Sequence, residues 1–420
     1  DLGDALWRPL HLGCHCRHHP AHVGKVVSPV SARAHIENGL LTGASFLDDP
    51  ALQKVLACLN GDGEETRIAG GAVRNALLGE KVRDIDLATT ALPTEASKRA
   101  KAAGFKVIPT GIEHGTVTIV ADGIPFEVTT LREDIKTDGR HAVVRFGRDF
   151  TADAMRRDFT INGLFVDQNR RVHDFTGGLA DIEAHKVRFI GNARQRIEED
   201  YLRILRLFRF HAAYGRGAVD RAGLEASIAG RDGLSGLSNE RIGAELMKLL
   251  EAKGAVAALV EMADAGLLGP LIAAVPHPSR LRNLAASEDM QGLQPDTTLR
   301  LTALAACIPD DAARLQEHLR LSNLQTTRMR QAIQAWQAIR NSDAPPPKTD
   351  LYRYLFQHGR RAALDGLLLA QAGAPATGQT ENWRSAYTFL HDTPEPRLPF
   401  TGSDLIKRGV KSGPAMGALL

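Results

Sequence analysis

The pattern of apolar and polar positions differs between two parts of this chain. From about residue 35 to 165, short apolar runs are separated by turn-forming residues, which is typical of strands alternating with helices. From about residue 193 onward, longer segments carry apolar residues at helical spacing. We therefore expect an α+β protein in which a small α/β head precedes a long helical region.

The apolar runs of the head predict short strands over residues 67–69, 85–88, 105–108, 116–120 and 124–131. The last two runs flank Asp122-Gly123, a strong hairpin signal. Helices are expected over 72–78, where Gly79 ends the helix, and from Pro93 to Gly104. Residues 132–152 are polar and lack periodicity, so they are predicted to form a mobile loop.

Glycine and proline divide the helical region. Unbroken helices are predicted over 198–213, 239–252 and 255–267. The proline-containing segments 276–278 and 345–347 are expected to be joints between helices.

The composition is that of an ordinary globular protein. Of 420 residues, 43% are hydrophobic and 24% are charged, which excludes a wholly disordered chain and a fibrous rod. The sequence has no run of 18 apolar residues, so no membrane span is expected. The 4 cysteines are too scattered for a disulfide scaffold, which favours a reducing, cytoplasmic compartment.

Residues 1–32 differ from the rest because Cys14 and Cys16 stand among several histidines. A metal-binding tail is one interpretation. Cys14 and Cys16 are separated by only one residue, so the combined Cys-x2-Cys and His-x3-His spacing of a zinc site is absent, which favours a disordered or non-native tail.

Asp84 and Asp86 stand at the start of a predicted strand. Alternation along a strand places both carboxylates on one face, where they repel each other unless a cation lies between them. Glu127, on a nearby predicted strand, is a candidate for a third ligand, and such oxygen ligands suit Mg²⁺. Asp-x-Asp triplets are also common on solvated strand edges, so the triplet alone does not establish a metal site.

Gly70 and Gly71 come between a predicted strand and a predicted helix. Glycines there let backbone N–H groups approach a phosphate, and the helix N-terminus favours its negative charge. The alternative is a tight turn that needs positive φ angles. Beside Asp84 and Asp86, a phosphate-binding turn points to nucleotidyl transfer.

Two further groups of charged residues suit nucleotide recognition. Arg156 and Arg157 suit bidentate contacts with phosphate, and Asp158 is a candidate acceptor for a ribose hydroxyl, although a surface ion-pair cluster is the alternative. Asp200 and Arg203 share a face of the predicted helix. A carboxylate accepts from the exocyclic amine of C or A, which G and U lack at the pairing position, so one Asp/Arg pair selects C and A together. The alternative is an ordinary helix ion pair, which Glu199 also forms with Arg203.

The segment 186–216 carries eight basic and three acidic side chains, a local excess of +5 in a chain whose net charge is +3. A basic patch of this kind is typical of a surface that binds along a nucleic-acid backbone. The alternative interpretation is a helix face that is simply exposed to solvent.

Four motifs in order resemble those of the bacterial class II CCA-adding tRNA nucleotidyltransferase and poly(A) polymerase family. They are Gly70-Gly71-Ala72-Val73-Arg74-Asn75, Asp84-Ile85-Asp86, Arg156-Arg157-Asp158-Phe159-Thr160-Ile161-Asn162 and Glu199-Asp200-x-x-Arg203-Ile204-Leu205-Arg206. Glu240-Arg241-Ile242 resembles the family's next helix motif. The glycine-bearing segment 402–420 resembles the helical motif near the family's end, after which a C-terminal piece is expected to be missing.

The resemblance implies a polymerase-β-like nucleotidyltransferase head (33–165), a neck that recognises the base (166–230), a helical body (231–335) and a tRNA-binding tail (336–420). It also implies a role for each matching residue. Asp84 and Asp86 would hold Mg²⁺, with Glu127 as a further catalytic residue. The nucleotide would be bound by Gly70, Gly71, Arg74, Arg157, Asp158, Asn162, Asp200, Arg203 and Arg206. A flexible loop of Asp138, Gly139 and Arg140 would switch the enzyme from C to A addition, and Arg194, Arg196 and Arg209 would contact RNA.

The implied activity is the addition of C, C and A to the tRNA 3′ end from CTP and ATP, with release of pyrophosphate. A poly(A) polymerase of the same fold and an A-only variant remain alternatives. Segment 107–116 lacks the arginine pair and Phe of poly(A) polymerases, which favours CCA addition. An inactive RNA-binding module is disfavoured because the motifs are intact. The family usually has Asp where Asn75 stands, and we expect a small effect of this exchange on phosphate placement.

Overall fold

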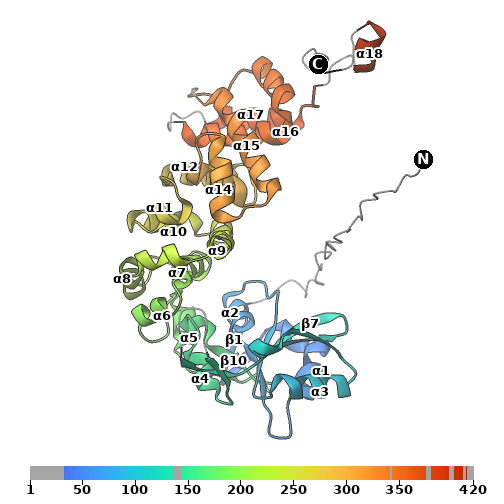
Figure 1. Ribbon diagram of the computed structural model, residues 1–420, viewed down its shortest axis with the longest axis vertical. Helices are drawn as coiled ribbons and strands as arrows, with labels where there is room; N and C mark the ends of the chain where they lie inside the picture. Colours follow the sequence, from blue (N-terminus) through green and yellow to red (C-terminus); the bar gives the residue numbers. More distant parts are fainter. Residues whose placement is uncertain are drawn as a thin grey trace, which may run out of the picture.

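The computed structural model describes residues 33–136, 143–340, 343–374, 380–396, 402–409 and 413. It is an elongated, curved molecule, with an α/β head at one end and a line of packed helices extending from it (Figure 1). The predicted α+β architecture is confirmed. Among the described residues, no helix is long and apolar enough to cross a membrane.

A seven-stranded mixed sheet, in the order β11-β10-β3-β4-β7-β6-β5, forms the centre of the head. Its strands are β3 (Thr66–Ala69), β4 (Asp86–Thr89), β5 (Lys106–Gly111), β6 (Thr116–Ala121), β7 (Ile124–Thr130), β10 (Leu164–Val166) and β11 (Val172–Asp174). Strands β4 and β7 pair in parallel, and the other neighbours are antiparallel. The predicted strands are confirmed, and the sheet continues past residue 165, the expected end of the head.

The helices of the head are α1 (Pro50–Leu59), α2 (Gly70–Leu78) and α3 (Pro93–Ala102). The Asp49 carboxylate caps α1, whose apolar side is buried. Helices α1 and α3 pack on β6, whereas α2 packs on β3 and β10. Gly79 ends α2 with a φ of 73°, as its position in the sequence predicts. Smaller elements complete the head: β1 (His35–Glu37), β2 (Leu40–Thr42), η1 (Ser45–Asp48) and η2 (Ile112–His114).

The prediction of a loop over residues 132–152 is wrong for 132–136 and 143–152, the described residues of that segment. Strands β8 (Arg132–Lys136) and β9 (Val143–Phe146) form a two-stranded antiparallel ribbon, and α4 (Phe150–Met155) begins soon after it. Leu131 joins the ribbon to the main sheet, because its N–H donates to the Thr89 carbonyl and its carbonyl accepts from the Gly147 N–H. Backbone pairing rather than an apolar pattern holds these strands, which is why the sequence did not reveal them.

The remaining described elements are helical. They are η3 (Thr160–Asn162), α5 (Gly178–Glu183), α6 (Ala193–Glu199), α7 (Leu202–Tyr214), α8 (Arg221–Ala229), η4 (Arg231–Gly236), α9 (Asn239–Glu251), α10 (Ala255–Asp264), α11 (Leu268–Ile272), α12 (Pro278–Met290), α13 (Thr297–Ala305), α14 (Asp310–Leu319), α15 (Asn323–Ile339), α16 (Lys348–Gly373), α17 (Thr380–Asp392) and α18 (Gly402–Lys407). Their buried apolar residues form one continuous core with those of the head.

The predicted unbroken helix over 198–213 is wrong, because α6 and α7 are separate. Asp200 is extended, with φ −160° and ψ 105°. Its carboxylate accepts the N–H of Leu202 at 3.1 Å and so caps the start of α7. Apolar periodicity does not show this break, because the pattern continues on both sides of it.

Candidate active site

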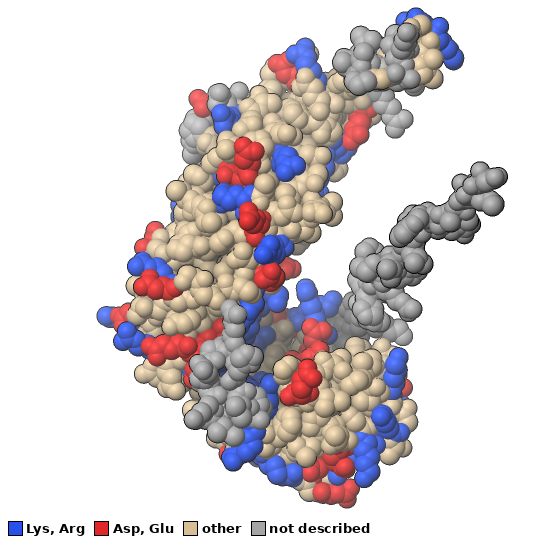
Figure 2. Space-filling model, viewed as in Figure 1, with Lys and Arg blue, Asp and Glu red and all other residues tan. Residues whose placement is uncertain are grey.

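A polar cleft of about 550 Å³ opens where the head meets the helical region. One side comes from β3, β4 and β7, and the other from the segment after α4 and from the junction of α6 and α7. Figure 2 shows basic and acidic side chains gathered in the hollow between the two parts. The cleft brings together most of the predicted site residues: Gly71, Arg74, Asp86, Glu127, Arg157, Asp158, Asn162, Asp200, Arg203 and Arg206.

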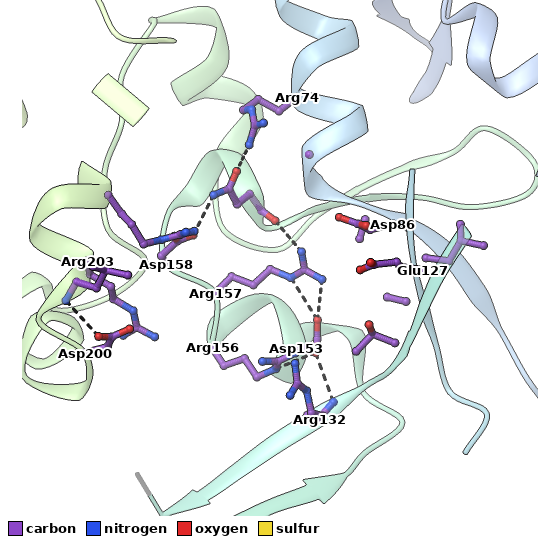
Figure 3. A pocket seen from close by; sticks show the side chains of 18 of the residues that line it. Arg74, Asp86, Glu127, Arg132, Asp153, Arg156, Arg157, Asp158, Asp200 and Arg203 are labelled. Atoms are coloured by element: carbon purple, nitrogen blue, oxygen red, sulfur yellow. Dashed lines mark hydrogen bonds and ion pairs between the residues drawn. The ribbon is translucent and has the colours of Figure 1, made fainter. Parts of the chain in front are cut away.

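Asp86 and Glu127 lie side by side at one end of the cleft (Figure 3). They are register partners on the parallel strands β4 and β7. The pKa of Asp86 is raised, chiefly by burial and further by the negative charges of Glu127 and Asp84. Asp84 stands before the strand and does not line the cleft, but its charge still acts on Asp86.

These carboxylates fit a divalent cation shared with substrate. Within the described part of the chain, no three Asp, Glu, His or Cys side chains form a group that could hold a metal ion. Mg²⁺ usually keeps several waters and takes one or two protein carboxylates together with substrate phosphates. A cation would also relieve the repulsion that raises the pKa of Asp86. The donor set therefore suits Mg²⁺ that arrives with a triphosphate rather than a closed protein site.

Gly70 and Gly71 form the first turn of α2, directly after β3. Neither has a positive φ, so the tight-turn interpretation is wrong. Gly70 is required by packing instead, because a Cβ at this position would lie 2.2 Å from the carbonyl oxygen of Asn162. Gly71 lines the cleft, and no side chain caps the helix. The N-terminal N–H groups of α2 are therefore placed to meet an anion.

Arg74 is buried among neutral hydrogen-bond acceptors. Its guanidinium donates to Oδ1 of Asn75 at 2.9 and 3.1 Å, to Oδ1 of Asn162 and to the Tyr214 hydroxyl at 3.0 Å. It also lies over the Tyr214 ring, 4.3 Å from the centroid. Burial lowers the pKa of Arg74, and no carboxylate of the described residues forms an ion pair with it. Its charge is therefore left for a bound anion.

Asn75, the departure from the family pattern, uses both ends of its amide. Its oxygen accepts from Arg74, and its Nδ2 donates to the Lys81 carbonyl at 3.1 Å. An aspartate would keep the first contact and lose the second, because a carboxylate does not donate.

Asp153 is a site residue that the sequence reasoning missed. Its carboxylate is buried and pairs with Arg156 at 2.5 Å and with Arg157 at 3.0 Å (Figure 3). Burial alone would raise the pKa of Asp153, but these two guanidinium groups hold it below its usual value. The surface ion-pair interpretation is therefore wrong for this cluster. Phe150, Asp153 and Ala154 stand at i, i+3 and i+4 of α4, a spacing that could have marked Asp153 as inward-facing.

Asp158 lies in the middle of a buried network. It accepts from Asn162 Nδ2 at 2.9 Å, from the Phe159 N–H at 2.9 Å and from Arg206 Nε at 2.8 Å. Burial would raise the pKa of Asp158, whereas the Arg206 charge and these hydrogen bonds lower it. Asn162 in turn accepts from Arg74 through Oδ1 and from Arg157 through its carbonyl, at 3.2 Å. The network thus connects the phosphate end of the cleft to α7.

Asp200 and Arg203 both reach the cleft, but each side chain has another partner. Oδ2 of Asp200 accepts from Arg241 of α9 at 2.7 Å. Nη1 of Arg203 donates to Glu199 Oε2 at 2.5 Å and to the Arg196 carbonyl at 2.7 Å. Arg241 was not among the predicted site residues, although its motif was recognised; its proximity to Asp200 depends on how α9 packs on α7.

The basic segment 186–216 is largely neutralised inside the fold. Acidic residues from other segments supply the partners: Asp181 for Arg188, Asp158 for Arg206 and Glu245 for Arg209. Arg194 is exposed, as RNA contact requires. Arg196, the next residue predicted to contact RNA, is 9% exposed, and all three of its guanidinium nitrogens donate internally, so its side chain is engaged within the fold.

Arg209, the third residue predicted to contact RNA, is engaged within the fold as well. Its Nε lies 2.7 Å from a Glu245 oxygen, and its guanidinium lies over the Phe210 ring. The predicted loop residues Asp138, Gly139 and Arg140 lie outside the described residues, as does the Cys/His-rich segment 1–32.

Comparisons with known proteins agree with this site. Residues 66–188 match the family model of the Poly A polymerase head domain. The mitochondrial CCA tRNA nucleotidyltransferase 1 of Mus musculus is 37% identical over 371 residues, which are 86% of this chain and 82% of the mouse protein. The chain belongs to the family of CCA-adding tRNA nucleotidyltransferases. The resemblance predicted from the motifs is thereby confirmed.

Bacterial members of the CCA-adding family are also similar to this chain. The CCA-adding enzyme of Lacticaseibacillus paracasei is 32% identical over 88% of this chain and 89% of its own. The Bacillus stearothermophilus CCA-adding enzyme, solved in complex with CTP, superimposes with a TM-score of 0.65 at 27% identity, over 88% of this chain and 91% of that one. The CCA-adding fold therefore extends over the head and most of the helical region.

Proposed function

We propose that this CCA-adding enzyme restores the 3′ end of tRNA by adding C, C and A from CTP and ATP, and that the polar cleft is its single catalytic site. One observation carries the proposal. The same cleft holds paired carboxylates, an uncapped helix N-terminus beside Arg74, and the Asp200 and Arg203 side chains. These are the groups needed to bind a triphosphate, to transfer its α-phosphate and to select a base.

The reaction joins the tRNA 3′ oxygen to the α-phosphorus of the nucleotide. The bond from that phosphorus to the departing pyrophosphate breaks, and the 3′ hydroxyl loses its proton. In this proposal Asp86 would hold Mg²⁺ together with the substrate phosphates, beside the negative charges of Glu127 and Asp84. When bound, the metal lowers the pKa of the attacking hydroxyl and neutralises charge on the phosphates.

The protein's own groups bind and orient the substrate. Gly70 and Gly71 present the N–H groups of α2 to the triphosphate, and Arg74 supplies beside them a positive charge that no ion pair of the described residues neutralises. Arg157, held by Asp153, faces the acidic end of the cleft. Asn162 and Asp158 fix these arginines, and Arg206 connects them to α7.

Asp200 and Arg203 select the base in this proposal. Arg241 and Glu199 hold the two side chains in the structure. A cytosine or adenine amine donates to Asp200, and Arg203 donates to the neighbouring ring atom. Guanine and uracil place a carbonyl opposite Asp200, so an acceptor faces an acceptor and the contact is repulsive.

Incorporation of labelled CTP and ATP tests the proposal. The substrates are tRNAs that end before the CCA, after the first C and after both, each with Mg²⁺ and with Mg²⁺ removed by EDTA. We expect two C additions, then one A, then a stop, and no addition in EDTA. A growing A tail without use of CTP would instead identify a poly(A) polymerase, and addition of A alone would identify an A-only enzyme.

Asp86→Ala supplies the matched test of the acidic residues. We expect this variant to bind tRNA normally and to incorporate no nucleotide, and Asp84→Ala to behave in the same way. Retained incorporation would refute the metal-binding role.

A cytoplasmic location is a further part of the proposal, and fractionation of the source cells tests it. Some relatives of this chain are mitochondrial by name.

A further inference from the structure

Arg196 occupies an unusual position, because one buried side chain connects two segments of the active site. Its Nη2 donates to the Arg157 carbonyl at 2.7 Å and to the Met155 carbonyl. Its Nε donates to the Ile190 carbonyl at 3.2 Å, and its Nη1 donates to Glu199 Oε2 at 2.9 Å. The guanidinium therefore joins the end of α4 and the segment after it, which carries Arg157, to the end of α6.

Glu199 continues this connection to the base-selecting end of the cleft. The oxygen that accepts from Arg196 is the same Oε2 that accepts from Arg203 at 2.5 Å. Nη1 of Arg203 also donates to the backbone carbonyl of Arg196 at 2.7 Å. Two contacts to residues 196 and 199 thus set the position of the Arg203 guanidinium.

The position of the Arg203 side chain depends on the contact between Arg196 and Glu199. Glu199 is a single carboxylate between two guanidinium groups, and its side chain is 15% exposed. Without Arg196, Glu199 would be free to rotate toward solvent and to take Arg203 with it. The carbonyls of Met155 and Arg157 would also lose a donor, so the distance between the two arginine-bearing segments would no longer be fixed.

We propose that Arg196 is a positioning residue for base selection: through Glu199 it fixes Arg203, and through the 155 and 157 carbonyls it fixes Arg203 relative to Arg157. The inference rests on the proposed role of Arg203 in reading the base. Arg196 is buried and its guanidinium nitrogens all donate within the protein, so its effect is on discrimination between bases rather than on tRNA affinity.

A double-mutant cycle with Arg196→Met and Glu199→Gln tests the link. The readout is the ratio of kcat/KM for CTP over UTP and for ATP over GTP, measured on the appropriate tRNA. We expect each single variant to lower both ratios about tenfold. This is less than the roughly 100-fold loss that a 1 Å misplacement can cause, because Arg203 keeps its contact with the Arg196 backbone carbonyl. The double variant should lose no more than either single variant, because both changes break one connection.

The control is Arg221→Met, which makes the same change in a side chain that is 90% exposed at the start of α8. Its base discrimination should equal that of the wild type. Circular dichroism and tRNA binding are measured for all variants. Should Arg196→Met fail to fold, Arg196→Lys replaces it. A lysine keeps the buried charge, but its single ammonium cannot span the carbonyls and Glu199 together, so discrimination should still fall.

Arg203→Ala separates this inference from the function on which it rests. Relaxed discrimination in Arg203→Ala, with unchanged ratios in folded Arg196 variants, would overturn the positioning role alone. Strictly additive effects of the Arg196 and Glu199 changes would overturn it as well. Unchanged discrimination in Arg203→Ala would overturn the base-reading role, and the positioning role with it.

Discussion

Replacement of Gly70 by alanine tests the packing at the centre of the site. The new Cβ would lie 2.2 Å from the Asn162 carbonyl oxygen and 2.9 Å from its carbonyl carbon. Carbon and oxygen usually come no closer than about 3.3 Å, so the helix and the Asn162 backbone must separate by roughly 1 Å. The obstacle is backbone, which has less freedom to yield than the end of a flexible side chain.

The expected cost follows from this displacement. Overpacking a buried site costs about 1–3 kcal/mol, and alanine recovers about 1 kcal/mol over glycine within a helix. Because the obstacle is backbone, the upper part of the overpacking range applies, about 2–3 kcal/mol. We therefore expect Gly70→Ala to lower the free energy of unfolding by roughly 1–2 kcal/mol. Nucleotide incorporation should fall about 100-fold, because Asn162 positions Arg74, Arg157 and Asp158 through its oxygen atoms and its amide.

Gly71→Ala is the matched control. A Cβ at this position meets nothing closer than Arg74 Nη2, at 4.0 Å, so the fold should be as stable as the wild type or slightly more stable. Gly71 lines the cleft, and its methyl group should raise the KM for CTP and ATP. Urea unfolding and incorporation kinetics measure both variants. Equal stability of Gly70→Ala and wild type, or a larger loss in Gly71→Ala, would refute the packing argument.

Three further changes have defined outcomes. Asp86→Asn should abolish incorporation yet raise the free energy of unfolding in EDTA at neutral pH, because the raised pKa of Asp86 means that the folded protein holds this charge unfavourably. The gain in stability should vanish as the pH falls through that pKa. A variant less stable than the wild type would contradict the electrostatic assignment. Asn75→Asp places a carboxylate beside Arg74 and should weaken triphosphate binding about fivefold, which corresponds to ~1 kcal/mol and is measured as a rise in KM. Unchanged KM values would show that the charge of Arg74 is not used to bind the triphosphate. Asp153→Asn should lower the free energy of unfolding, measured in urea, by about 2–3 kcal/mol. This is less than the loss caused by breaking a fully buried ion pair, because Arg156 and Arg157 stay partly exposed. A stability equal to that of the wild type would refute this magnitude.

Local sequence was informative wherever the determining interaction is local. The Asp122-Gly123 hairpin and the end of α2 at Gly79 are examples, because φ angles of 50° and 81° at the turn and 73° at Gly79 suit the residues present. The ribbon of β8 and β9 and the break at Asp200 were not predictable in this way. The first depends on backbone pairing between two short strands that lack apolar alternation. The second depends on the Asp200 side chain, which accepts the first N–H of the next helix within a continuing apolar pattern.

The sequence by itself determined the family, the order of the motifs and the residue types available for catalysis, because motif spacing is a property of the chain. Only the tertiary structure decided which charges remain available. Arg196 and Arg209 belong to a basic segment, yet carbonyls and Glu245 from distant positions engage them inside the fold. Arg74, by contrast, is surrounded by neutral acceptors and keeps its charge for a ligand. The charge of a side chain is neutralised by the acidic or polar groups that lie within a few ångströms of it. Those groups come together only when the head packs against the helices.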